Sequence, residues 1–431
     1  MTDRQRNHVI DLARACSVLV VVVYHTLVYR VTLQDGRPGL EAWAAPTWLY
    51  PLTWALMIMP LFFVAGGFAH TLTLDRLRAD GGVSIGYWLA GRGRRLLGPL
   101  TVFVTFCTLL FSGATWAGWS EAAELSRLFM QLLWFIAVYL VVVAIAPGMV
   151  RLHDRFGAAV PVALAVLAAG VDAWSFAVDQ YALRNLNMLL VWPLVHQLGI
   201  AYQRGWWRRG PVAAAWGSIV AGVAGIGVLV VGFGYPPTAV GFADLPIANL
   251  QPPTLAMAFL ALAQCGALGL LERSGVLAQL SGRVQRVVSI LNVVTMSVYL
   301  WHIPCLVASG VVLLLAALAW PAVAGILLSP VTLALATIAT VAAVIPLLGR
   351  LELWAIPPMG RAQDDGLAVL AYVLLAGGAF GVWQAGTVVH PAHLLSSLGV
   401  LAIWASWWTM RRAADRNARP GRPVRPGRPG D

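Results

Sequence analysis

Long apolar runs separated by short polar segments fill the chain from about residue 8 to residue 410. A transmembrane helix needs about 20 consecutive apolar residues, and the pattern contains about twelve runs that approach this length. Only 11% of the residues are charged, and the mean hydropathy of +0.77 lies far outside the range of ordinary soluble domains. We therefore predict an all-α, polytopic transmembrane helix bundle with about 10–12 spans.

The positive charge of the chain, formally +11, follows the predicted membrane topology. All 29 basic residues are arginines, and 24 of them fall in one alternating set of loops and both terminal segments. The opposite set of loops holds only Arg30, Arg37, Arg127 and Arg184, while Arg14 lies inside the first span. The positive-inside rule then places both termini in the cytoplasm. Because topology accounts for the charge, no nucleic-acid partner is expected.

The chain divides by composition into three parts. Residues 1–350 form the main membrane domain, and residues 351–410 add two transmembrane helices. Residues 411–431 are rich in arginine, proline and glycine, so we expect a disordered cytoplasmic tail attracted to anionic lipid headgroups. The four cysteines lie in apolar runs without metal-ligand spacing, so we expect neither a disulfide framework nor a metal site: Cys16, Cys107, Cys265 and Cys305.

Three ionisable residues interrupt the first apolar run, Asp11 to His25. At about 100° per residue, Arg14 and His25 lie on one helical face, roughly 16 Å apart along the axis. Asp11 precedes Arg14 by three residues and shares that face. The spacing puts the carboxylate and guanidinium near the start of the helix and the imidazole near mid-membrane. Ionisable groups in lipid are costly and are usually functional, so this helix is the first candidate site.

Other polar positions within the apolar runs favour packing over chemistry. Gly66 and Gly67 permit close approach between helices. His70 lies near a cytoplasmic helix end, where a snorkelling role is at least as expected as a ligand role. For His196 and Gln197, in the middle of a span, interhelical hydrogen bonding is the favoured interpretation.

Charged residues of the predicted outer loops carry less information. Asp172, Asp179 and Arg184 fall in one such loop. We interpret the acids as solvated loop charges, since a contact to an acceptor sugar has no support from the sequence.

A basic segment and a histidine next to a proline are further candidates. Arg92 and Arg95 share a helical face, whereas Arg94 points elsewhere. The cluster is consistent with a topological anchor and equally with guanidinium groups that grip phosphates of an anionic cytoplasmic cofactor. His302 precedes Pro304 by two residues, and a proline there frees a backbone carbonyl beside the imidazole. Functional and structural roles for His302 are equally consistent with this pattern.

Four segments together resemble the integral-membrane acyltransferase 3 family. DLARACSVLVVVVYH matches the family's arginine, ten residues, then histidine, and MPLFFVAGGF matches its proline, aromatic pair and glycine. RGRRLLGP is similar to its basic run before proline, and SVYLWHIP to its late Tyr-Leu-x-His-x-Pro. The resemblance extends from about Asn7 to Gly349, and the first segment is its most specific part.

The resemblance implies a donor and a set of roles. The donor is acetyl-CoA or another acyl-CoA, used as a substrate and not as a bound cofactor, and no metal is implied. An imidazole, with an unperturbed pKa near 6.5, suits a general base or a transient acyl carrier. The implied roles are His25 as the essential imidazole, Arg14 binding donor phosphate or stabilising negative charge, Asp11 orienting Arg14, Arg92, Arg94 and Arg95 holding the CoA end, and His302 and Tyr299 lining the same cavity.

The resemblance further implies a hydroxyl-bearing glycan, lipid or metabolite as the acceptor, and a multi-pass protein of the bacterial cytoplasmic membrane. Membrane lipids surround it, and a separate extracytoplasmic transferase is a further partner to consider. A transporter or flippase that uses Asp11, Arg14 and His25 as an intramembrane relay is the main alternative. A non-catalytic partner of a biosynthetic complex is another. Activity that depends on acyl-CoA would distinguish an acyltransferase from the other two classes. The sequence contains no evident inverted repeat, which speaks against a transporter.

Overall fold

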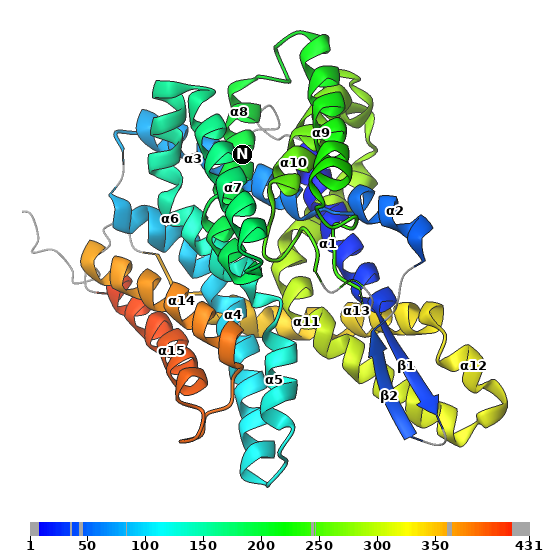
Figure 1. The fold of residues 1–431 in the computed structure, drawn as a ribbon. Coiled ribbons are helices and arrows are strands. Elements are labelled where there is room, and N and C mark those ends of the chain that lie inside the picture. Colours follow the sequence, from blue (N-terminus) through cyan, green and yellow to red (C-terminus); the bar gives the residue numbers. More distant parts are fainter. Residues whose placement is uncertain are drawn as a thin grey trace, which may run out of the picture. The chain divides into compact units, whose positions relative to one another are not determined.

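The structure is a computed structural model that describes residues 8–34, 37–42, 46–82, 84–242, 245, 247–359 and 364–415 (Figure 1). Within this part of the chain, ten helical segments are long and apolar enough to cross a membrane. The prediction of an all-α, polytopic helix bundle is thereby confirmed. A short antiparallel hairpin, β1 (Tyr29–Gln34) and β2 (Arg37–Ala42), follows the first helix. Most of the predicted tail, residues 416–431, lies outside the described residues.

The chain forms two compact units, which we describe separately. The first unit comprises Met1–Asp80 and Val141–Leu347, and the second comprises Gly81–Leu140 and Leu348–Asp431. The helices of the first unit are α1 (His8–Val28), α2 (Tyr50–Ala55), α3 (Met59–Ala79), the C-terminal half of α6 (Leu133–Phe156), α7 (Ala159–Ala177), α8 (Val191–Arg204), α9 (Val212–Phe233), α10 (Leu255–Arg273), α11 (Gly282–Ala319), α12 (Ala324–Leu327) and most of α13 (Pro330–Ala355).

Glycines bring α3 and α8 into close contact. A Cβ atom on Gly67 of α3 would collide with the carbonyl oxygen of His196, and one on Gly199 of α8 would collide with the carbonyl oxygen of Val64. Helices that present glycine to each other can approach until their backbones touch, which is how membrane helices pack without a hydrophobic driving force. The pair Gly67 and Gly199 therefore fixes this crossing.

An ionic network joins the C-terminal ends of α3, α6 and α8. The Arg204 guanidinium donates to both carboxylate oxygens of Asp75, at 2.6 and 3.1 Å, and to both of Asp154, at 2.8 and 3.0 Å. Arg78 donates to Asp154 at 3.3 Å. At the end of α10, Glu272 accepts from Arg208 and from the Tyr202 hydroxyl, both at 2.7 Å. Four helix ends thus lie at one face of the first unit, the face that the arginine pattern assigns to the cytoplasm.

The opposite ends of the first unit meet around α2. The helix breaks between α2 and α3, and Gln264 of α10 donates to the freed carbonyl oxygen of Met57 at 2.7 Å. The connection between α9 and α10 is tied to α2, because Trp54 donates to the carbonyl oxygen of Pro237 and the Ala239 N–H donates to Thr53 Oγ1. Buried backbone groups at a break need such partners in lipid.

The second unit is built on α4 (Ile85–Trp116), which Ser84 caps by accepting a hydrogen bond from the Tyr87 N–H. The helices α14 (Asp365–Ala385) and α15 (Leu394–Asp415) lie side by side and pack on α4, with the short α5 (Ala122–Met130) beside them (Figure 1). Trp404 of α15 donates to Thr105 of α4 at 3.0 Å, and Ser406 donates to the carbonyl oxygen of Ala371. The two helices added after residue 350 are therefore integral to this unit.

Candidate active site

His25 and His302 come together from opposite ends of the sequence. Their ring centroids are 5.0 Å apart, and His302 Nε2 lies 3.4 Å from His25 Nδ1. A second contact holds the same two helices, because Asn292 of α11 donates to the backbone oxygen of Asp11 at 2.8 Å. In both contacts the order of residues along α1 matches the order along α11, so the two helices run parallel. This pairing of α1 with α11 positions both imidazoles.

His25 lies in the last turn of α1, nearer the helix end than the mid-membrane position inferred from the sequence. The described helix starts at His8 and ends at Val28. Arg14 therefore lies in its second turn, and His25 lies close to its C-terminus. His302 is 1% exposed and sits in the middle of α11, two residues before Pro304. On α1 the pair therefore lies toward the end that the arginine pattern assigns to the outer side, whereas on α11 it lies at mid-helix.

The hydrogen bonds show which nitrogen carries the proton when each ring is neutral. Carbonyl oxygens only accept, so His25 Nδ1–H donates to the carbonyl oxygen of Val21 at 2.8 Å, and His302 Nδ1–H donates to that of Tyr299 at 2.8 Å. His302 Nε2 then carries a lone pair that faces His25 Nδ1–H, a long contact shared with Val21. His25 Nε2 carries the other lone pair, and no described residue donates a hydrogen bond to it.

This arrangement has the form of a base held by an orienting group. His302 fixes the ring of His25, while the unshared Nε2 of His25 is the nitrogen available to take a proton or an acyl group. Two tyrosines line the pair: the Tyr299 ring centroid is 6.1 Å from that of His302, and the Tyr24 centroid is 5.6 Å from that of His25. The geometry of the histidine pair is thus suited to proton transfer at His25 Nε2.

The other predicted residues of α1 show less. The backbone of Asp11 is held by Asn292, as above, and Arg14 is half-buried. Arg14 forms neither a hydrogen bond nor an ion pair with another described residue, so its orientation by Asp11 stays a prediction. Its guanidinium is therefore not consumed by a structural contact within the described part of the chain.

The basic cluster Arg92, Arg94 and Arg95 belongs to the second unit. Arg94 donates to the carbonyl oxygen of Pro357 at 3.1 Å, a contact that ties the segment after α13 to α4. The Arg92 guanidinium lies over the Trp88 ring, 4.9 Å from its centroid, and Arg95 is exposed. Arg94 thus has a structural contact, whereas donor binding by the three arginines stays a prediction.

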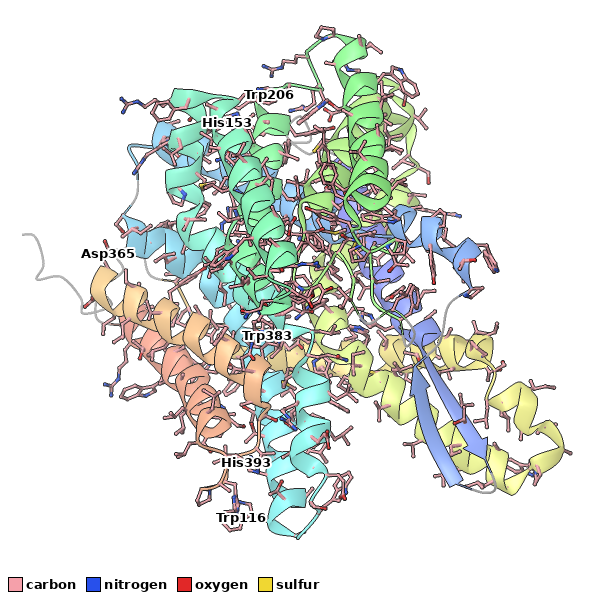
Figure 2. The ribbon with its side chains drawn as sticks, in the orientation of Figure 1. Trp116, His153, Trp206, Asp365, Trp383 and His393 are labelled. Carbon is pink, nitrogen blue, oxygen red and sulfur yellow. The ribbon has the colours of Figure 1, made fainter. Side chains whose placement is uncertain are left out.

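Polar side chains in α3, α6 and α8 bond to one another. His70 and His196 are in contact at 3.0 Å between Nδ1 and Nε2. Gln197 donates to the Met149 carbonyl oxygen and accepts from His153 Nδ1, both at 2.9 Å. The His153 ring lies beside Trp206, 5.4 Å between centroids (Figure 2). These contacts agree with interhelical hydrogen bonding, the interpretation that the sequence favours for His196 and Gln197.

The interpretation of Asp172 as a solvated loop charge is wrong. α7 extends to Ala177 and carries Asp172 on its inner face, where the side chain is fully buried. Arg184 is also buried, in η3 (Tyr181–Leu189), a 3₁₀ segment between α7 and α8. A hydrophobicity pattern locates spans but does not show which loop charges fold back under a helix end.

A family model described as an acyltransferase domain, that of acyltransferase 3, matches residues 7–349. No curated protein and no solved structure matches the chain. The match spans most of the sequence and includes both histidines of the pair as well as the basic cluster. The ten helical segments suited to membrane crossing make the protein a multi-pass membrane protein. The family match makes it a membrane acyltransferase, without identifying its donor or its acceptor. The chain belongs to the acyltransferase 3 family.

Proposed function

We propose that the protein transfers an acyl group, most simply acetyl, from acyl-CoA to a hydroxyl group of a glycan, lipid or metabolite. Membership of the family supports acyl transfer, and the contact between His25 and His302 is the observation that supports His25 as the base that activates a hydroxyl. Ionisable residues within membrane spans are rare and often mark a functional site.

In the proposed reaction, His25 Nε2 takes the proton of the acceptor hydroxyl. The oxygen attacks the thioester carbonyl, the C–O bond forms, the C–S bond breaks, and the proton passes to the CoA thiolate. His302 Nε2 stabilises the imidazolium that His25 becomes, because it accepts from the Nδ1–H of His25 throughout.

A second route keeps the same residues and splits the reaction into two steps. His25 Nε2 attacks the thioester itself, the N–C bond forms, the C–S bond breaks, and CoA leaves as its thiolate. The acceptor oxygen then attacks the acyl-imidazole, the C–O bond forms, the C–N bond breaks to restore the neutral ring, and the proton of the hydroxyl neutralises the released thiolate. In both routes we propose that Arg14 stabilises negative charge or binds donor phosphate. The family resemblance is what supports a separate role for Arg92, Arg94 and Arg95, in the second unit, in holding the CoA end.

The test is transfer or hydrolysis of radiolabelled acetyl-CoA by purified full-length protein in lipid, with an acceptor extract. Wild type and His393→Ala, which changes a histidine in the connection between α14 and α15, are expected to release or transfer label, whereas His25→Ala is not. Rapid quenching separates the two routes, because only the acyl-imidazole leaves label on the protein.

Equal behaviour of wild type and His25→Ala, with acetyl-CoA binding confirmed, contradicts the proposal. Movement of an unmodified substrate across the membrane, blocked by His25→Ala, then favours the transporter.

A further inference from the structure

Arg184 is a buried guanidinium without a hydrogen-bond partner in the described part of the chain. The side chain is 1% exposed, and its Nε, Nη1 and Nη2 atoms are all buried and unpartnered among the described residues. Two aromatic rings cover the group, with the guanidinium carbon 4.4 Å from the Phe176 centroid and 4.8 Å from the Tyr181 centroid. A ring stacked on the face of a guanidinium attracts its charge but does not accept hydrogen bonds from its in-plane N–H groups.

The neighbouring carboxylate does not consume these donors. Asp172 accepts three hydrogen bonds of 2.9 Å each, from Asn187 Nδ2, the Tyr235 hydroxyl and the Leu255 N–H. Arg184 forms no ion pair with it or with any other described carboxylate. Asp172 is thus satisfied by neutral donors, and it balances the charge of Arg184 only from a distance.

The titration behaviour of the groups outside the spans is consistent with this geometry. Burial lowers the pKa of the Arg184 guanidinium, and the charge of Asp172 opposes that shift. An arginine nevertheless stays protonated in proteins. Burial and the Asp172 carboxylate raise the pKa of Tyr235, so its hydroxyl remains a donor. The cluster therefore keeps a cation whose N–H groups have no acceptor among the residues that the structure describes.

Such a group is costly for folding. A buried donor left unsatisfied destabilises the folded state, and a charged one does so more strongly. An apolar side chain of similar size in its place is commonly neutral or stabilising. Stability alone does not explain a guanidinium here, whereas a ligand with two adjacent oxygens would satisfy its donor fork.

Arg184 lies among exposed residues of the same segment. Tyr181, Asn185 and Leu186 of η3 are exposed, and the ring of Tyr181 lies over the guanidinium. A 3₁₀ run of nine residues is long for this type of helix, whose hydrogen bonds have poorer geometry than those of an α-helix. The arginine pattern places this segment on the outer side, where an acceptor would approach.

We propose that Arg184 anchors an oxyanion-binding subsite, which takes a carboxylate or phosphate group carried by the acyl acceptor. The link to an acceptor rests on the proposed function, whereas the binding of an oxyanion does not.

The first experiment measures binding without any acyl donor. Full-length protein in phosphatidylcholine nanodiscs is melted with sodium phosphate, sodium glucuronate, glucose, or sodium chloride at matched ionic strength. We expect saturable upward shifts in melting temperature with phosphate or glucuronate only. Arg184→Met is expected to lose the shift completely and, without a probe, to melt no lower than wild type.

Arg127→Met is the matched control, because Arg127 is exposed and lies on the same predicted side. It is expected to shift as wild type does. Should Arg184→Met fold poorly, Arg184→Lys keeps the charge but removes the fork, and it is expected to lose most of the shift.

A second set of nanodiscs identifies the source of the oxyanion. If a lipid headgroup fills the subsite, phosphatidylglycerol raises the melting temperature of wild type but not of Arg184→Met, and soluble oxyanions add nothing. If no oxyanion, soluble or lipid, produces a shift that depends on Arg184, the proposal fails. Arg184→Met then melts lower than wild type, as a purely structural cation requires.

Acyl transfer is measured separately, so the two proposals fail in different ways. Once transfer is established, Arg184→Met is expected to lower kcat/KM for an anionic acceptor by about tenfold or more while acetyl-CoA hydrolysis persists. If the protein binds an oxyanion but shows no acyl-CoA chemistry, the oxyanion-binding subsite is supported and its link to an acyl acceptor is contradicted.

Discussion

At the scale of single residues, the chemistry depends on which ring nitrogen is left unshared. The backbone carbonyls of Val21 and Tyr299 each take one N–H, and this determines that Nε2 of both rings is free of a proton in the neutral state. The Nε2 of His302 faces His25, whereas the Nε2 of His25 meets no described donor and is the atom that takes the substrate proton in the proposed reaction. The roles of the two histidines therefore differ although their residue type is the same.

His302→Gln tests this division of roles. Glutamine keeps an acceptor near His25 but not the geometry of the ring, so we expect kcat to fall by about 10–100-fold, as for other orienting groups. KM for acyl-CoA is expected to stay the same, because the substitution does not touch the donor. Steady-state kinetics of wild type, His302→Gln and His25→Ala measure the split.

His393→Gln serves as the control for His302→Gln, since it makes the same change outside the pair. A rise in KM at constant kcat, or a loss as large as that of His25→Ala, argues against an orienting role. Melting curves for all variants ensure that the loss is not one of folding.

At the scale of elements, two glycines on facing helices set how closely α3 and α8 approach. Each one faces a carbonyl oxygen on the other helix, so the contact is reciprocal and leaves no room for a methyl group on either side. The same crossing carries His70 and His196, whose contact at 3.0 Å depends on the approach. Packing and polar contact at this crossing therefore support each other.

Gly67→Ala is expected to destabilise the protein by about 1–3 kcal/mol, the usual cost of overpacking. The methyl group must push α8 away and stretch the contact between His70 and His196. Gly217→Ala in α9 is the matched control, because a Cβ there meets no atom within 4 Å. It is expected to be neutral or slightly stabilising, as alanine is a better helix former. Thermal melts in one detergent compare the two, and equal melting temperatures contradict the reciprocal contact.

The sequence predicts the spans well because each span is a local property of about 20 residues. It does not predict the buried faces, since lipid and protein interior are equally apolar. Asp172 is an example. Its charge suggests a solvated loop, yet it lies in α7, where its buried carboxylate accepts three hydrogen bonds. The contact between His25 and His302 spans 277 positions, and no helical spacing indicates it. Here the family motifs, and not periodicity, suggested that both residues belong to one site.

At the scale of the whole molecule, the arginine distribution predicts which side of the membrane each loop occupies. The ionic network around Arg204 joins helix ends that the pattern assigns to the cytoplasm. The cluster around Asp172 joins helix ends that it assigns to the outer side. The alternation of loops and the contacts within the first unit are therefore consistent with each other.

Cysteine labelling tests this orientation. We expect Ala182→Cys, exposed in η3, to react with a membrane-impermeant maleimide in intact expressing cells. Ala79→Cys, exposed at the end of α3, is expected to react only after the membrane is permeabilised. The native thiols give the background, with Cys107, Cys265 and Cys305 buried and Cys16 exposed within a span, where a charged maleimide does not reach. The reverse pattern would place Arg184 on the cytoplasmic side, next to acyl-CoA, and its oxyanion would then have to be a phosphate of the donor.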